Sequence, residues 1–163
     1  MTAWLRERPG TRVESMGVMT RVRWIAKLLE DDHRRVLDRL GIDVATRDLL
    51  STLRRSGPPY RLTAGELTRL SWVTTGATSQ RLVRAEQQEF IRRYRNPDQA
   101  RQVLVELTPA GHRVIDATLD ALLDREQELL KGLSEGEQDQ LADLLRLLLT
   151  DLIDRTGARD WST

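Results

Sequence analysis

Two short helical patterns lie close together between residues 63 and 88, and their spacing constrains the fold more than any other feature. The first begins within LTAGELTRL, where Thr63 and Glu66 have the spacing of a capping box. The second, TTGATSQRLVRAEQQ, begins at Thr74 or Thr75 after a three-residue connection. Two short helices joined so tightly predict a helix-turn-helix, with Leu67 in their shared apolar contact.

A β-hairpin is predicted directly after the second of these helices. Residues 91–95 and 101–107 alternate like strands, and Asn96-Pro97-Asp98 between them has turn chemistry. The hairpin carries four arginines: Arg92, Arg93, Arg95 and Arg101. An extended guanidinium can enter a narrow minor groove or bind phosphate. A helix-turn-helix followed by such a wing therefore predicts binding to double-stranded DNA.

The distribution of charge agrees with a polyanionic partner. The whole chain has a net charge of only +1, but residues 51–105 carry 10 Lys+Arg against 4 Asp+Glu. Residues 106–163 carry 6 against 13. A segregated basic segment favours phosphate contacts, each of which releases condensed counterions. A solvated charged surface is the alternative explanation for a charge run taken alone.

The second helix of the pair presents short polar groups and a glycine on one side. A DNA major groove accommodates one helix and shows a distinct pattern of donors and acceptors for each base pair. From the helix and the wing we predict this set of DNA-contacting residues: Thr75, Gly76, Thr78, Ser79, Gln80, Arg81, Arg84, Arg93, Arg95 and Arg101.

Long helical patterns flank the winged segment on both sides. Apolar residues recur every three or four positions over 15–40, and a helix over 44–55 can be capped by Asp43. Thr108 and Pro109 open a helix to about Lys131, and another begins at Ser134. The predicted fold is mainly α with a small two- to three-stranded β wing. Three regions follow: helices over 1–42, a winged helix-turn-helix over 43–107, and helices over 108–163.

The last helix contains more apolar residues than a small core requires. Residues 141–153 hold seven leucines and one isoleucine. This excess predicts a partner helix from a second copy of the chain, so we expect a homodimer. The terminal helices would then be dimerisation helices. An intramolecular bundle is the alternative.

Composition argues against several other classes of protein. The chain has no cysteine and only two histidines, so we expect no metal site and no cofactor. It also lacks a glycine-rich phosphate loop and a Ser-His-Asp or Cys-His set, so we expect that the protein is not an enzyme. No apolar run approaches 18 residues and no leader is evident at the start, so we expect a cytoplasmic protein without a membrane span.

From Asp43 to about Gly111 the chain resembles the MarR family of winged-helix regulators. The resemblance rests on LTAGELTRL, TSQRLVRAEQQEFIRR and NPDQARQVLVELTPAG. It implies a homodimeric transcriptional repressor on a pseudo-palindromic operator. Two departures stand out: Glu89 replaces a family glycine after the second helix, and Gln99-Ala100 replaces an Asp-Arg pair in the wing. We expect altered or weaker readout by the wing.

Within the family, the segments AWLRERPGTRVESMGVMTR and RDLLSTLRRSGPPYRLTAGEL resemble the urate-responsive, PecS-like branch. This resemblance implies a small-molecule effector such as urate or an aromatic acid. It implies a ligand-sensing set of Trp4, Arg21, Asp48 and Arg93, in which an indole stacks on a planar ring and Asp48 pairs with Arg93.

Two other functions remain open at the level of sequence. A winged helix can serve as a protein-interaction module that has lost DNA binding, and Gln99-Ala100 favours that reading. A repressor that binds DNA without any effector is the other possibility.

Overall fold

The computed structural model describes residues 2–10, 13–71, 74–97, 99 and 101–157. The chain divides into two compact units, Met1–Leu122 and Leu123–Thr163. Within the described residues, no helix combines the length and the apolar character needed to cross a bilayer. The division into three regions stays a prediction.

The helix-turn-helix forms as the sequence predicts. Helix α3 (Val44–Arg55) is capped by Asp43, whose side chain accepts a hydrogen bond of 2.7 Å from the Thr46 amide. The predicted capping box opens α4 (Ala64–Leu70). Helix α5 (Thr75–Gln87) begins after Thr74, whose hydroxyl accepts from the Ala77 amide. Residues 72 and 73 of the connection lie outside the described residues.

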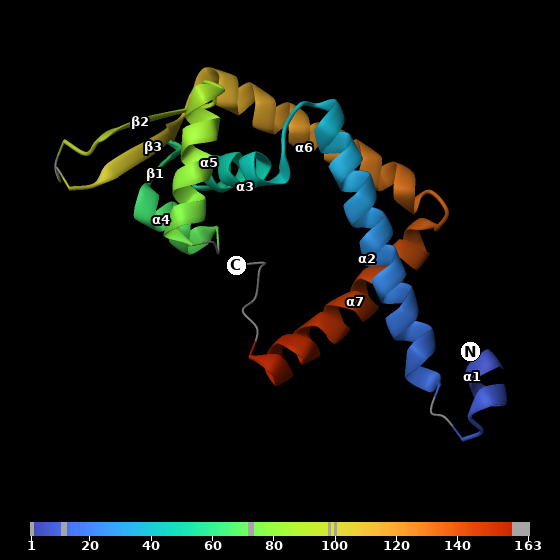
Figure 1. Ribbon diagram of the computed structural model, residues 1–163. Helices are drawn as coiled ribbons and strands as arrows, with labels where there is room; N and C mark the ends of the chain where they lie inside the picture. The colour runs from blue at the N-terminus through green and yellow to red at the C-terminus, as the bar shows by residue number, and fades with distance from the viewer. Residues whose placement is uncertain (1, 11–12, 72–73, 98, 100, 158–163) are drawn as a thin grey trace. The chain divides into compact units, whose positions relative to one another are not determined.

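The wing belongs to a three-stranded antiparallel sheet of order β1-β3-β2. Its strands are β1 (Arg61–Thr63), β2 (Ile91–Arg95) and β3 (Val103–Leu107). The hairpin of β2 and β3 projects from the three helices (Figure 1). Strand β3 starts two residues later than predicted because Gln102 donates its amide to the Gln99 carbonyl, at 2.8 Å, within the turn.

One hydrophobic core joins these helices to the sheet. Side chains from α3, α4 and β3 are at most 1% exposed: Leu49, Leu50, Leu53, Leu67 and Val105. Burial of a leucine side chain contributes about 1.5–3 kcal/mol, so this cluster holds the helix-turn-helix and the wing in one body. The core fixes the orientation of α5 relative to the sheet.

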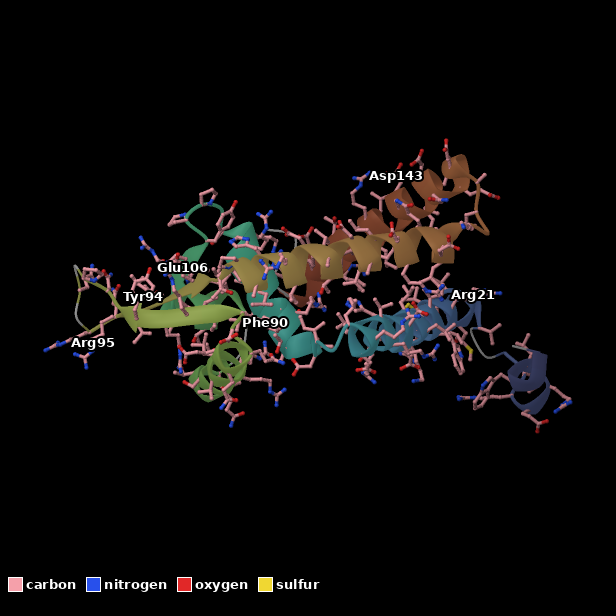
Figure 2. The ribbon with its side chains drawn as sticks, turned by 90° about the horizontal axis from the view of Figure 1, so that it is seen from above. Arg21, Phe90, Tyr94, Arg95, Glu106 and Asp143 are labelled. Carbon is pink, nitrogen blue, oxygen red and sulfur yellow. The ribbon has the colours of Figure 1, made fainter. Side chains whose placement is uncertain are left out.

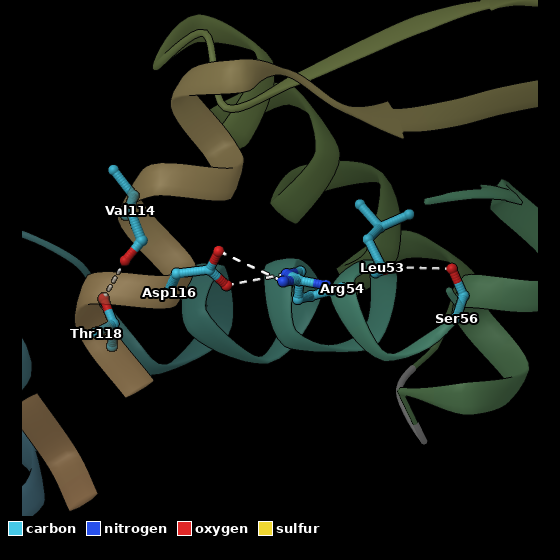
Figure 3. A network of polar contacts seen from close by, with 6 residues as sticks. All are labelled: Leu53, Arg54, Ser56, Val114, Asp116 and Thr118. Atoms are coloured by element: carbon cyan, nitrogen blue, oxygen red, sulfur yellow. Dashed lines mark hydrogen bonds and ion pairs between the residues drawn. The ribbon is translucent and has the colours of Figure 1, made fainter. Parts of the chain in front are cut away.

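Helix α6 (Pro109–Leu130) packs its first half against this body. The Arg54 Nε donates to Asp116 Oδ1 at 2.9 Å and so links α3 to α6 (Figure 3). Gly111 lies so close to the backbone of Phe90 that an added Cβ would be 2.0 Å from its carbonyl oxygen. Only glycine fits at this point of the helix.

The amino-terminal helices leave most of their apolar surface exposed. Helix α1 (Thr2–Glu7) is followed by α2 (Glu14–Arg39). Val36 and Leu37 at the end of α2 join the core, whereas Trp24 and Leu28 are 60% and 61% exposed.

The second unit contains the end of α6 and helix α7 (Glu135–Thr156). The predicted capping box is confirmed: the Glu137 carboxylate accepts from the Ser134 amide at 2.8 Å and from its hydroxyl at 2.7 Å. None of the α7 residues is buried within the chain, and Leu144 is 65% exposed.

Candidate nucleic-acid interface

The face of α5 that points away from the core is exposed and, apart from Val83, carries no large apolar side chain. This outer face of α5 consists of Thr75, Gly76, Ser79, Gln80, Val83 and Arg84. The opposite side of the helix packs Leu82 and Ala85 into the core. Arg81 is half-buried at the edge between the two sides. The helix thus offers short polar side chains to an external partner on a rigid support.

Thr78 corrects the predicted set. It is only 3% exposed, and its hydroxyl lies 3.0 Å from the hydroxyl of Thr68 on α4. The same hydroxyl is 3.2 Å from the Thr74 carbonyl. Thr78 therefore fastens α5 to α4, and its side chain is not available to DNA.

Nothing among the residues that the structure describes requires glycine at position 76. A Cβ added there would meet no atom within 4 Å, and its backbone is helical. Glycine destabilises a helix by about 0.5–1 kcal/mol relative to alanine. Gly76 leaves the first turn of α5 open to close approach by a partner.

Arg84 extends across the outer face to an ion pair with Asp43, the cap of α3. Its side chain is nevertheless 62% exposed. The two residues are 41 positions apart in sequence. No local pattern in the sequence announces this pair, and our prediction missed it.

Arg93 at the base of the wing is engaged by Glu86 at the end of α5. The Arg93 Nε donates to Glu86 Oε2 at 2.8 Å, and this hydrogen bond holds the pKa of the Glu86 carboxyl below its usual range. Asp48 instead lies 3.3 Å from Arg47. The predicted pair of Asp48 and Arg93 is therefore wrong. The opposite charges flanking the helix-to-strand turn could have suggested Glu86.

The turn between α5 and β2 contains Glu89, which stands where the MarR family has a glycine. Glu89 adopts a left-handed backbone with φ of 59°. The Phe90 amide then donates to the Ala85 carbonyl at 3.0 Å, and Thr108 donates its hydroxyl to the Glu89 carbonyl at 2.6 Å. These hydrogen bonds over-determine the turn, so Glu89 holds a left-handed backbone that glycine adopts more readily.

The far end of the wing carries two free cations. Arg95 and Arg101 are exposed and make no ion pair with the residues that the structure describes. Figure 2 shows Arg95 at the distal end of β2, pointing outwards. Amide side chains stiffen the tip, where Asn96 Nδ2 donates to Gln102 Oε1 at 3.2 Å. Ala100 lies outside the described residues.

The outward face of the sheet is neutralised at its centre. Arg92 donates to Glu106 at 2.8 Å and Tyr94 donates its hydroxyl to the same carboxylate at 2.6 Å. Figure 2 shows Tyr94 and Glu106 close together. The hydrogen bond from Arg92, and to a smaller extent that from Tyr94, lowers the pKa of the Glu106 carboxyl. A cavity of about 420 Å³ adjoins them, lined also by Tyr60 and His112. Arg92 is thus less available to DNA than Arg95.

A second cavity, of about 520 Å³, lies between α1 and α2. Its lining is Trp4, Met16, Gly17, Thr20 and Arg21. The structure thus brings together Trp4 and Arg21 of the predicted ligand-sensing set. Asp48 and Arg93 do not line this cavity. Arg21 Nη1 donates to the Gly17 carbonyl at 2.7 Å, and its guanidinium stays exposed.

No three or more histidines, cysteines or carboxylates are clustered for a metal ion among residues 2–157 that the structure describes. The arrangement in this part of the chain offers cations, hydroxyls and amides on an exposed helix and hairpin. Such groups bind phosphates and base edges.

Residues 40–102 match the model of the MarR family. Over 142 residues, the chain is 28% identical to the transcriptional regulator PecS of Dickeya dadantii, with 87% of this chain and 86% of PecS aligned. The chain is therefore similar to the MarR family across its winged-helix region. The predicted resemblance and the winged-helix fold are confirmed.

Solved structures agree with this similarity. A MarR mutant from E. coli, crystallised with operator DNA, superposes with a TM-score of 0.62 at 26% identity, covering 86% of this chain and 99% of that one. A MepR mutant from S. aureus superposes with a TM-score of 0.75 at 23% identity, over 82% and 97% of the two chains. The MepR likeness concerns the fold alone.

Proposed function

We propose that this protein is a sequence-specific DNA-binding transcriptional regulator that acts as a homodimer on a pseudo-palindromic operator. The observation that carries the proposal is the outer face of α5. It is polar, exposed and held rigidly by the core, beside a hairpin with free arginines at its end. A helix of this kind fits the major groove, and the arginines fit a minor groove or phosphates.

The comparison with the E. coli MarR mutant supports this proposal, because that protein was crystallised with operator DNA. The name of PecS describes a transcriptional regulator. We assign repression on the analogy of the family. The cytoplasm is the compartment in which such a protein would meet DNA.

The homodimer is supported by the apolar surface that one chain leaves uncovered. The leucines of α7 and the exposed apolar residues of α2 would be costly in water at this density. A symmetric dimer would bury them and place two copies of α5 about one helical turn of DNA apart, roughly 10 base pairs.

Fluorescence anisotropy with DNA from upstream of the gene tests the function. We expect binding that weakens steeply between low and moderate salt, because several arginines replace counterions. A random duplex of the same length is the control for specificity. Failure to bind either duplex at low salt would refute the proposal and favour a winged helix that binds proteins.

A small anionic or aromatic effector is the second part of the proposal. The cavity between α1 and α2 supports it, since the indole of Trp4 and the guanidinium of Arg21 line the same space. Urate or an aromatic acid could stack on the ring and pair with the cation. Asp48 and Arg93 do not line this cavity, so the proposed ligand contacts are Trp4 and Arg21.

Titration with urate and aromatic acids tests the effector. We expect the ligand to quench tryptophan fluorescence and to release bound DNA. Trp4→Phe should reduce the fluorescence change, while Trp24→Phe, at a residue that does not line the cavity, should retain it. DNA binding that no ligand alters would leave a regulator without this effector.

A further inference from the structure

The ion pair between Asp43 and Arg84 joins the start of α3 to the outer face of α5. These two parts of the protein have different roles. One carboxylate oxygen of Asp43 accepts from the Thr46 amide at 2.7 Å and caps α3. The other accepts from Arg84 on the outer face of α5. Asp43 therefore links the start of α3 to the outer face of α5, which is proposed to contact DNA.

Arg84 and Arg93 are both paired with carboxylates, but their surroundings differ. The side chain of Arg93 is 30% exposed, and two of its nitrogens bind one oxygen of Glu86. The side chain of Arg84 is 62% exposed, and one of its nitrogens binds Asp43. Arg93 thus holds β2 against α5, whereas Arg84 can exchange Asp43 for another partner.

Resting on the DNA-binding function proposed above, we propose that Asp43 competes with a DNA phosphate for Arg84 and thereby lowers the affinity of α5 for DNA. A phosphate beside the outer face of α5 can take Arg84 only when the ion pair with Asp43 breaks. Each DNA-binding event must break this ion pair, so the free energy of the pair reduces the affinity for DNA. Asp43 is therefore a positioning residue that sets this affinity.

The capping role makes this proposal testable without unfolding the helix. Asparagine caps a helix as well as aspartate does, and its side-chain oxygen can accept from the Thr46 amide. Asp43→Asn thus removes the charge and keeps the cap. Asp43→Ala removes both and should lower the melting temperature, which separates the two roles.

The experiment measures DNA affinity by anisotropy at low salt for wild type, Asp43→Asn, Arg84→Ala and the double variant. Asp43→Asn should tighten binding about two- to fivefold, the worth of an exposed ion pair. In the Arg84→Ala background the same substitution should change affinity very little. Higher salt should shrink the gain, because the pair is then screened.

A general loss of negative charge is the alternative cause of tighter binding. Asp38→Asn on the last turn of α2 removes the same charge from an exposed position five residues away. It serves as the matched control and should leave affinity close to that of wild type.

Three results would overturn the inference. One is unchanged affinity for Asp43→Asn when wild type binds DNA, which leaves the proposed function intact. Another is an equal gain in the Arg84→Ala background, which assigns the effect to bulk charge. The last is a wild type that binds no DNA at low salt, which removes the proposed function as well.

Discussion

The winged-helix body and the terminal helix α7 use similar residues in opposite ways. In the body, Leu50, Leu53 and Leu67 are fully buried within one chain. In α7, Leu144 and Leu147 are 65% and 62% exposed, although this helix is richer in leucine than the body. The body completes its own core, whereas α7 has an apolar face that nothing in its unit covers.

The contrast indicates where each part obtains its stability. The body is stabilised by contacts between its own helices and sheet, so it can hold α5 rigidly for a partner. Helix α7 obtains no comparable burial from its own unit and needs a second surface. Four substitutions test this contrast, from the largest expected effect to the smallest.

Gly111→Ala should break the body. Its Cβ would lie 2.0 Å from the Phe90 carbonyl oxygen, so either the helix or the α5–β2 turn must shift. We expect a loss of about 3 kcal/mol or more, measured by urea denaturation. Gly136→Ala in α7, where a Cβ meets nothing within 4 Å, is the control and should not destabilise. Equal stability of both variants would contradict the observed packing.

Leu144→Asp should break the dimer and leave the body folded. If each copy buries this leucine, the substitution loses about 1.5–3 kcal/mol per subunit, so dissociation should increase at least about 100-fold. Analytical ultracentrifugation measures it. Thr150→Asp adds the same charge to the polar side of α7 and should keep the dimer. A monomeric wild type, or a dimeric Leu144→Asp, would refute α7 as the interface.

Gln80→Ala should reduce sequence preference with no loss of stability. A side-chain amide bonds an adenine edge in two places, which discriminates by about 1–3 kcal/mol, so preference at one base pair should fall about tenfold. Binding to a library of single-base operator variants measures it. Gln87→Ala, at the end of α5, is the control. An unchanged preference would show that another face of α5 reads the bases.

Glu89→Gly should have the smallest effect, a gain in stability of about 0.5 kcal/mol. A left-handed backbone costs a non-glycine residue roughly 1–2 kcal/mol, partly offset by the greater entropy of unfolded glycine. Thermal denaturation should show a slightly higher melting temperature. Gln88→Gly, at a residue with φ of −84°, should lower it. A lower melting temperature for Glu89→Gly would mean that its side chain stabilises the turn.

Local signals in the sequence gave correct predictions for most elements. The capping box of Thr63 and Glu66, the cap at Asp43 and the turn at Asn96 depend on neighbours within four residues. Their outcome is therefore visible in the sequence. The predicted start of β3 was two residues too early, because turn geometry decided how many residues were left unpaired.

The candidate site was predicted less well than the fold. Exposure separated Gln80 from Thr78 on one helix, and periodicity alone had placed both in the DNA-contacting set. Arg93 was assigned to Asp48 from the resemblance, but Glu86 lies closer in the fold. Both errors concern which residue a side chain contacts once the chain is folded.

The sequence by itself determined the order of helices and strands, the segregation of positive charge and the apolar excess of α7. These properties follow from spacing and composition along the chain. Tertiary structure alone decided that Asp43 holds Arg84 and that Gly111 must lack a side chain. Each of these depends on two segments far apart or on a close backbone approach, which only the packed core brings into contact.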